Sequence, residues 1–403
     1  MDELAVFLLG VRAGRLILKD NGNLQFRYDS DYRGPVVSQA LPIQEAAHPH
    51  DVCRAVFGGL LLEGEARTAL ARNLGISAGN DYALLKEVGG DCAGAVVLLE
   101  AEAEFPTTPQ LRSLDEGELD ALLRELPQRP LAADRHEGIR LSLAGAQPKL
   151  PVVVGHGKVA LPLNTAAATT HIIKPEPSRF PGLVDNEAFC LELAHAVELP
   201  AAVASSHFTT SGLPYLLVER YDRNVASGLI RRLHQEDVCQ ALGYPSDRKY
   251  QADRGPGIAD TVALLRSCSA VPAQDLPTFW RAVVFNWLIG NCDAHAKNFS
   301  LLYDGGAPTL APLYDLVSTT AYPELTGRLA MTIDGARMIE EVRAETWTTL
   351  ATEVGYSRRF VRSATDTLIE RVLDESRRLA AEPRHDNDVV RTILGGIRVR
   401  AGV

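Results

Sequence analysis

The sequence has 403 residues, which is enough chain for two or three packed units. Hydrophobic residues make up 46% and charged residues 23%, as in an ordinary globular protein, and the net charge of -10 argues against a general coat for nucleic acid. No apolar run is long enough to cross a membrane, and the first residues lack the basic segment of a signal peptide, so we expect a cytoplasmic protein without membrane contact. The six scattered cysteines, with no C-x-x-C pair, predict free thiols.

The first third of the chain predicts a small α+β domain. Residues 4–28 alternate apolar and polar side chains around an Asn-Gly-Asn turn, as β-hairpins do. Apolar residues at helical spacing then fill residues 51–85, and a second helical pattern covers residues 115–126. A polar, proline-containing stretch over residues 127–137 predicts a linker. We therefore place the end of the first domain at residue 133.

A turn of small residues opens the next region, residues 134–245, which we expect to be β-rich. The turn, Ala144–Lys149, stands just before the strand-like run Val152–Val154. A turn of this kind can lay backbone N–H groups along phosphates. It matches neither G-x-G-x-x-G nor the Walker lysine pattern, so on its own an ordinary β-hairpin is the favoured interpretation.

Two further features of this region are typical of a nucleotide site. Lys174 ends a β-branched run, and a lysine held on a strand can neutralise nucleotide phosphates. Glu187, in a predicted helix, is a candidate ion-pair partner for that lysine. The apolar run of residues 215–218 then leads into charged residues, where a two-lobed kinase would pass its hinge along the adenine.

The pattern with the strongest chemical content lies at residues 285–300. A buried helix is predicted to end at Gly290-Asn291, since both residues tolerate the left-handed conformation of a helix C-terminus. Asp293 and Asn298 have the Asp-x4-Asn spacing of the kinase catalytic loop, where the Asp accepts a hydroxyl proton and the Asn binds magnesium. Asp315 ends an apolar run that we expect to be a strand after a short hairpin. Its carboxylate and the Asn298 amide are the hard oxygen ligands that magnesium requires.

The remaining chain, residues 246–403, is predicted to be mostly helical apart from this loop and hairpin. Residues 357–403 contain ten arginines and seven acidic residues, so this segment is basic in an acidic chain. A basic face on it could be formed by Arg358, Arg359, Arg362, Arg377 and Arg378. A solvated helix surface is favoured over a DNA contact on this pattern alone. Gly395-Gly396 is expected to break the last helix.

Several separated motifs occur in a recognisable order. They are Val56–Leu61 with Gly64–Arg67, Gly89–Ala95, Ser142–Lys149, Ile173–Pro175, Asn186-Glu187, Val218–Arg223, Gln235–Asp237, Asn291–Ser300 and Pro312–Asp315. With these motifs the chain resembles the HipA-like serine/threonine kinases, the toxins of HipBA-type bacterial toxin–antitoxin pairs. The resemblance implies an α+β, two-lobed protein-kinase-like fold with an additional N-terminal α+β domain. We accordingly expect an N-terminal domain over residues 1–133, a β-rich kinase lobe over 134–245 and a helical lobe over 246–403.

The resemblance also implies a role for each matching residue. Asp293 would be the catalytic base, Asn298 and Asp315 the magnesium ligands, and Ser142 the serine whose autophosphorylation expels the phosphate loop and silences the enzyme. The residues implied to bind ATP are Ala144, Gly145, Ala146, Gln147, Pro148, Lys149, Lys174, Glu219, Arg220, Tyr221, His295, Ala296, Lys297, Asn298, Tyr314 and Asp315. One departure is Pro148, which stands where some members have glutamate and which offers no N–H to a phosphate.

The implied activity is that of an ATP- and magnesium-dependent protein kinase toxin that phosphorylates an aminoacyl-tRNA synthetase. The implied partner is a HipB-like helix-turn-helix antitoxin dimer, which would bind operator DNA together with the kinase. Three alternatives stay open: a kinase fold kept mainly as a corepressor, a small-molecule phosphotransferase, and a hydrolase using Cys292, His295 and Asp293. The hydrolase is disfavoured, because residues so close in one loop rarely reach the geometry of nucleophile, base and orienting group.

Overall fold

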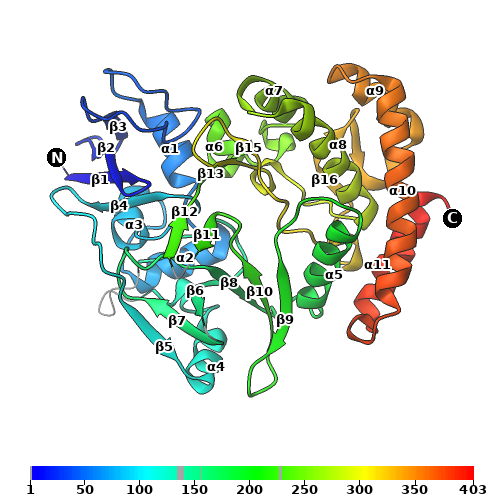
Figure 1. The fold of residues 1–403 in the computed structure, drawn as a ribbon, viewed down its shortest axis with the longest axis horizontal. Helices are drawn as coiled ribbons and strands as arrows, with labels where there is room; N and C mark the ends of the chain where they lie inside the picture. Colours follow the sequence, from blue (N-terminus) through cyan, green and yellow to red (C-terminus); the bar gives the residue numbers. More distant parts are fainter. Residues whose placement is uncertain (1, 134–139, 156, 227–228) are drawn as a thin grey trace. The chain divides into compact units, whose positions relative to one another are not determined.

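The computed structural model describes residues 2–133, 140–155, 157–226 and 229–403. The chain falls into two compact units, each built from separate stretches of sequence (Figure 1). Unit 1 comprises residues 1–175, 207–246 and 302–306, and unit 2 comprises residues 176–206, 247–301 and 307–403. Strands β9 (Ala204–Phe208) and β14 (Ser300–Tyr303) each carry the chain from one unit to the other. The expected boundary at residue 133 lies inside unit 1, and the three-domain division stays a prediction.

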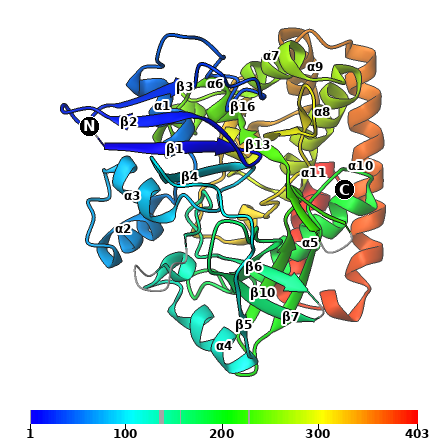
Figure 2. The same ribbon diagram turned by 60° about the vertical axis from the view of Figure 1, so that its left-hand side comes forward.

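A four-stranded antiparallel sheet begins unit 1 (Figure 2). Its strands, in the order β3-β2-β1-β4, are β1 (Asp2–Leu8), β2 (Val11–Leu18), β3 (Leu24–Tyr28) and β4 (Val96–Glu100). The helices between β3 and β4 are α1 (His50–Gly58), α2 (Gly64–Asn73) and α3 (Asp81–Val88). Leu4, Val6 and Leu8 share one core with Phe26 and Phe57, so alternate residues of β1 face the helices. The predicted hairpins and helices are confirmed here.

A second sheet of unit 1 carries two of the predicted nucleotide ligands. It contains, in the order β5-β7-β6-β8-β10, the strands β5 (Leu111–Leu114), β6 (Leu150–Gly155), β7 (Lys158–Pro162), β8 (His171–Pro175) and β10 (Pro214–Glu219). Lys174 of β8 stands opposite Leu216 of β10 in antiparallel register. The remaining elements of the unit are α4 (Glu116–Glu125), β11 (Arg223–Ala226), β12 (Leu229–Arg232), β13 (His234–Asp237) and α6 (Val238–Leu242). The helix predicted over residues 115–126 is confirmed as α4.

Three arginines and two aspartates form a buried ion network in unit 1. Arg220 donates to both carboxylate oxygens of Asp222, at 2.9 and 2.7 Å, and its Nη1 lies 3.3 Å from Asp91. Arg223 and Arg232 donate to the other oxygen of Asp91, at 3.0 and 2.8 Å. Burial alone would raise the pKa of Asp91, but the three arginines lower it well below its ordinary value. The network therefore connects Asp91 to residues 220–223 and to Arg232.

Helices build most of unit 2. They are α5 (Leu183–Ala196), α7 (Ile258–Cys268), α8 (Pro272–Ile289), α9 (Ala344–Glu353), α10 (Arg358–Ala380) and α11 (Asp388–Ala401). The short strands are β15 (Thr309–Leu310), β16 (Arg328–Ile333) and β17 (Ala336–Met338). Figure 1 shows the long helix α10, drawn in orange, running beside α11 in red. No helix in the described part of the chain is long and apolar enough to cross a membrane.

Two predictions for unit 2 are wrong. Gly395-Gly396 does not break the last helix, because α11 continues through both residues to a left-handed cap at Gly402. Burial of the face that carries Val390, Ile393 and Ile397 outweighs the loss of about 1 kcal/mol of helix propensity at each glycine. The strand expected to run up to Asp315 ends at Leu310, and residues 311–315 are irregular apart from a parallel bridge between Leu313 and Ala201.

Candidate active site

Helix α8 leads directly into the predicted catalytic loop, which lies in unit 2. The helix is anchored by buried aromatic side chains, those of Phe279, Trp280 and Trp287. It ends at Gly290, which has the left-handed conformation, with φ 79°. A Cβ at Gly290 would lie only 2.0 Å from Oγ1 of Thr320, so the end of the helix has space for glycine alone. The predicted end of the helix is confirmed, and the loop leaves it in a defined direction.

The buried side chain of Asn291 organises the loop. Its Nδ2 donates to Oδ1 of Asn286 at 2.7 Å, and its Oδ1 accepts the backbone N–H of Asp293 at 3.1 Å. The same Nδ2 makes a longer hydrogen bond, 3.4 Å, to the backbone carbonyl of Asp315. Asn291 is 4% exposed, so these bonds form away from bulk water. One amide thus connects the backbones of Asp293 and Asp315, which lie 22 residues apart in sequence.

The carboxylate of Asp293 is exposed and has a partner that the sequence analysis missed. The Tyr250 hydroxyl donates to Oδ1 of Asp293 at 2.9 Å. The ring of Tyr250 meets the His295 imidazole edge to face, with centroids 5.4 Å apart. Tyr250 stands 43 residues before Asp293, in a segment of mixed polar residues without a recognisable motif, so no local signal pointed to it.

The Asp-x4-Asn segment closes on itself through a short 3-10 turn, η4 (Ala296–Asn298). The backbone N–H of His295 donates to Oδ1 of Asn298 at 3.0 Å and to the Asp293 carbonyl at 2.8 Å. An amide oxygen has two lone pairs, so Oδ1 of Asn298 keeps one for a further ligand. The described residues hold no group of three or more His, Cys, Asp or Glu side chains suited to a metal. The two predicted ligands, the Asn298 amide oxygen and the Asp315 carboxylate, instead suit magnesium, which takes few protein oxygens and completes its shell with phosphate and water.

Asp315, the second predicted magnesium ligand, sits in a rare backbone conformation. Its φ is 51°, in the left-handed region that residues with a side chain seldom adopt. The preceding residues hold it there: Tyr314 donates its hydroxyl to the Lys297 carbonyl at 2.6 Å, and Leu313 bonds with Pro200 and Ala202 at 2.9 and 2.8 Å. Such a conformation persists only where surrounding contacts impose it, which is characteristic of functional sites.

The contacts and burial of Cys292 are those of a structural residue. Its N–H donates to Oγ1 of Thr319 at 2.9 Å, and its carbonyl accepts the N–H of Ala330 at 2.8 Å. The thiol is buried, and burial raises its pKa. A nucleophilic cysteine requires a lowered pKa, so this environment argues against the hydrolase alternative.

The predicted phosphate loop lies in unit 1 and is packed against the N-terminal part of that unit. Ser142 is fully buried, and its hydroxyl donates to the Leu60 carbonyl at 2.7 Å. Gly145 has φ 111°, and its carbonyl accepts the N–H of Glu63 at 3.1 Å. The Lys149 ammonium donates to the Ala144 carbonyl at 2.6 Å, where a Cβ on Gly145 would lie 2.7 Å from Nζ. A glycine at position 145 therefore allows the cation to sit under the turn.

The other predicted ligands of unit 1 differ in what their side chains are available to do. Lys174 is 5% exposed on β8, and Glu219 is exposed at the end of β10. The Arg220 guanidinium is committed to the buried ion network, so any contact of this residue with a nucleotide would fall to its backbone. Tyr221 donates its hydroxyl to Gln235. Lys174 belongs to unit 1 and Glu187 to unit 2, and their pairing stays a prediction.

Comparison with known proteins identifies the family of the chain. Residues 141–376 match the model of the HipA-like C-terminal domain, and residues 4–99 match that of the HipA N-terminal domain. The chain belongs to the HipA-like family. The protein Y4mE of Sinorhizobium fredii is 41% identical over 409 residues, covering 97% of both chains.

A second relative adds a solved structure to the comparison. The serine/threonine-protein kinase toxin HipA of Shewanella oneidensis is 31% identical over 328 residues, which cover 78% of this chain and 74% of that protein. A chain in a solved complex of HipA, HipB and operator DNA from the same organism matches with a TM-score of 0.85 at 26% identity. That match covers 99% of this chain and 96% of the other. The predicted α+β, HipA-like kinase fold is therefore confirmed.

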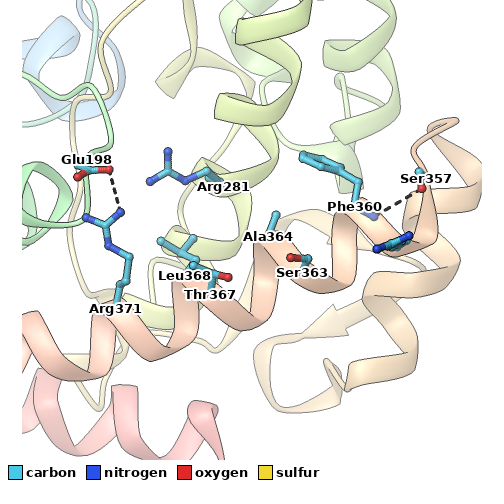
Figure 3. Close-up of a pocket in the computed structure, with 10 residues that line it drawn as sticks. Glu198, Arg281, Ser357, Phe360, Ser363, Ala364, Thr367, Leu368 and Arg371 are labelled. Atoms are coloured by element: carbon cyan, nitrogen blue, oxygen red, sulfur yellow. Dashed lines mark hydrogen bonds and ion pairs between the residues drawn. The ribbon is translucent and has the colours of Figure 1, made fainter.

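The basic face predicted for this HipA-like chain lies along α10, beside a hollow of about 540 Å³ (Figure 3). Arg371 pairs with Glu198 at 2.9 Å at one end of the hollow, and Arg281 points into it next to them. Several of the predicted arginines are paired with acids three or four residues away, in the helix or just beyond its end. These pairs are Arg362–Asp366, Arg377–Asp374, Arg378–Glu375 and Arg378–Glu382. Such pairing is typical of a solvated helix surface, which was the favoured interpretation of this segment.

Proposed function

We propose that this chain is an ATP- and magnesium-dependent serine/threonine-protein kinase that acts as the toxin of a type II toxin–antitoxin system. The observation that carries the proposal is the Asn291 amide, which bonds to the backbone of both Asp293 and Asp315. A base and a magnesium carboxylate held by one buried amide match the needs of phosphoryl transfer, in which catalysis is mostly positioning and charge neutralisation. Membership of the HipA-like family supports the same chemistry.

In the proposed reaction the protein residues position groups and move one proton. Asp293 accepts the proton of the attacking serine hydroxyl, and the Tyr250 hydroxyl keeps its carboxylate oriented. Asn298 and Asp315 would hold magnesium, which supplies charge neutralisation on the ATP phosphates. The hydrogen bond from His295 to Asn298 fixes the amide, so its oxygen is presented in one orientation.

The surroundings of Ser142 support self-inactivation by autophosphorylation. A hydroxyl that is fully buried and bonded to the Leu60 carbonyl must leave that position before it can receive a phosphate. A phosphoserine carries about -1.5 to -2 charges and cannot return to a site built for a neutral hydroxyl. We infer that the modified loop stays displaced, which removes Ala144–Lys149 from the nucleotide.

The relatives supply the biological setting of the proposal. The solved complex of the Shewanella oneidensis proteins contains HipA, HipB and operator DNA. We infer that this chain likewise binds a small helix-turn-helix antitoxin dimer and reaches operator DNA through it. The substrate class we propose, from the family resemblance, is an aminoacyl-tRNA synthetase in the cytoplasm.

Transfer of labelled phosphate from ATP tests the function directly. The full chain, with magnesium, is incubated with purified aminoacyl-tRNA synthetases and with a panel of small hydroxyl compounds, and Asp293→Asn serves as the inactive comparison. Labelling of one synthetase and of Ser142, both absent in Asp293→Asn, is the expected result. Labelling of a small compound instead would indicate a small-molecule phosphotransferase. Operator binding with the antitoxin but no labelling would indicate a corepressor.

A further inference from the structure

Residues 248–257 of unit 2 form a tight turn that carries Tyr250, whose hydroxyl bonds to the predicted base. The Tyr250 carbonyl accepts the N–H of Asp253 at 3.0 Å and that of Gly255 at 2.9 Å. A Cβ at Gly255 would lie 2.0 Å from the carbonyl oxygen of Arg248, so the turn has no space for a side chain at this position. The backbone on both sides of Tyr250 is therefore closely held.

The next side chain connects the same turn to strand β16. Oε1 of Gln251 accepts the backbone N–H of Thr332 at 2.7 Å and the Thr332 hydroxyl at 3.0 Å. Strand β16 in turn bonds to the predicted catalytic loop, since the N–H of Ala330 donates to the Cys292 carbonyl at 2.8 Å. The turn and the loop thus share one strand as support, which limits their movement relative to each other.

A cation lies over the ring of Tyr250. The Lys249 ammonium is 5.3 Å from the ring centroid, within the range of a cation–π contact. On the same ring, the His295 imidazole makes an edge-to-face contact, with centroids 5.4 Å apart, and the hydroxyl donates to Oδ1 of Asp293 at 2.9 Å. Lys249 and Tyr250 are both partly buried, so water screens the cation–π contact less than it would at a fully exposed site.

The contact has a chemical consequence at the other end of the ring. A nearby cation favours the form of a phenol in which more negative charge lies on the oxygen, so the hydroxyl becomes a stronger hydrogen-bond donor. The acceptor of this hydroxyl is the carboxylate of Asp293, and hydrogen bonds to a charged acceptor are stronger than those between neutral groups. A positive charge at Lys249 therefore strengthens the bond that Tyr250 makes to the predicted base.

We propose that Lys249 is a positioning residue for the kinase reaction: its ammonium, lying over the Tyr250 ring, strengthens the hydrogen bond by which Tyr250 orients Asp293. The inference rests on the proposed function, because it gives Lys249 a role in the base of that reaction. Lys249 acts through Tyr250 and binds neither ATP nor the protein substrate. Its loss should therefore lower kcat and leave the KM values for both substrates within about twofold.

Nuclear magnetic resonance of the full chain tests the contact without ATP. The chain is isotopically labelled at the Cζ carbon of tyrosine, and the Tyr250 signal is assigned with Tyr250→Phe. A stronger phenol donor has a Cζ signal closer to that of tyrosinate. We expect Lys249→Met to move the signal away from that of tyrosinate, Lys249→Arg to restore it, and the effect of Lys249→Met to shrink to less than about half in the Asp293→Asn background. A signal unchanged by Lys249→Met, or an equal change in both backgrounds, would overturn the proposal.

Kinetics test the path from Lys249 to the base. The kcat for phosphoryl transfer should fall about 2–5-fold in Lys249→Met and recover in Lys249→Arg, which keeps a cation over the ring. Lys158→Met, at an exposed position of β7, is the matched control and should leave kcat unchanged.

The decisive comparison uses Tyr250→Phe, which keeps the aromatic ring and removes the hydroxyl. In that background Lys249→Met should change kcat by less than about 1.5-fold, and equal losses in the two backgrounds would refute a path through the hydroxyl. If Lys249→Met is poorly folded, Lys249→Gln replaces it with the same expected results. An unaltered chain that transfers no phosphate would refute the proposed function, whereas the resonance comparison would still decide whether Lys249 strengthens the Tyr250 bond.

Discussion

The ion network around Asp91 in unit 1 and the loop around Asn291 in unit 2 are both buried polar centres, but they are built from different groups. Asp91 is surrounded by Arg220, Arg223 and Arg232, so its charge is neutralised in place. Around Asn291 the hydrogen bonds run between amides and backbone groups. In unit 1 the arginines bind the carboxylate of Asp91 itself. In unit 2 the Asn291 amide binds the backbone of Asp293 and Asp315, not their carboxylates.

We interpret the enclosed carboxylate of Asp91 as a contribution to stability and the backbone-held carboxylates of Asp293 and Asp315 as candidates for function. A carboxylate enclosed by arginines contributes to the fold only while it stays charged and enclosed, and it has nothing left to offer a substrate. A carboxylate positioned through its backbone is not enclosed by cations, so a proton or a metal can still approach it. Asp293 is exposed and Asp315 has a left-handed φ of 51°, which is consistent with the roles proposed for these two residues.

The comparison is tested most severely by Asp293→Asn. This change keeps the shape of the side chain and removes the proton acceptor, so phosphoryl transfer should fall by about 10²–10⁴-fold. The free energy of unfolding should stay within about 0.5 kcal/mol, because the carboxylate is exposed. Kinase assays and urea unfolding measure the two effects. Asp374→Asn, an exposed position on α10, is the control and should change neither.

Asp91→Asn should show the opposite behaviour. Loss of the carboxylate charge leaves the buried Arg220 and Arg223 with Asp222 alone and removes the carboxylate partner of Arg232, so the free energy of unfolding should fall by about 3–5 kcal/mol. Asp304→Asn is the matched control, since Asp304 pairs with Arg231 at 2.7 Å in an exposed position, and it should lose less than about 1 kcal/mol. Equal losses in the two variants, measured by urea unfolding, would remove the distinction drawn for unit 1.

Asn291→Ala removes the amide that connects Asp293 with Asp315, so it should affect both properties. Asn286 and two backbone groups lose a buried partner, which should cost about 1–3 kcal/mol of unfolding free energy. Transfer should fall at least about tenfold, because the base and the metal carboxylate lose their common support. A variant that loses stability with unchanged transfer would show that the amide serves packing alone.

Acid should weaken unit 1 before the loop of unit 2. The folded pKa of Asp91 lies below the ordinary value of 3.8, so its stabilising contribution is present above that pH and is lost as the pH falls toward the folded pKa. Unfolded chains then bind a proton that folded ones do not, which costs up to about 1.4 kcal/mol per pH unit. The protection factor for hydrogen exchange should therefore fall between pH 4 and 2 at Gly94, whose N–H donates to Asp222, before it falls at Asp293. Simultaneous opening would contradict this order.

The smallest expected effect belongs to Tyr250→Phe. Loss of one hydroxyl bonded to Asp293 should raise the barrier to transfer by about 0.5–1.5 kcal/mol, or about 2–10-fold in rate. The pH dependence of kcat should shift upward at its acidic limb, since the carboxylate loses a donor that favours its charged form. A purely structural tyrosine would lower the melting temperature and leave that limb in place.

The local elements were readable from the sequence because their causes are local. Gly290 ends α8 as predicted, since cap chemistry depends on neighbouring residues. The hairpins of residues 2–28 follow from alternation around a turn. The same reasoning misjudged Gly395-Gly396, because helix propensity was weighed without the buried face that continues α11.

By itself the sequence determined the order of the motifs, the Asp-x4-Asn spacing and the family. Tertiary structure alone decided that Tyr250 bonds to Asp293, that Arg220 is buried among charges and that Asp315 adopts φ 51°. The reason is physical: spacing and capping act over a few residues, whereas these features depend on groups that are distant in the chain and meet only after packing. The sequence could name Asp293 as the candidate base, but only the fold could supply the hydroxyl and the amide that hold it.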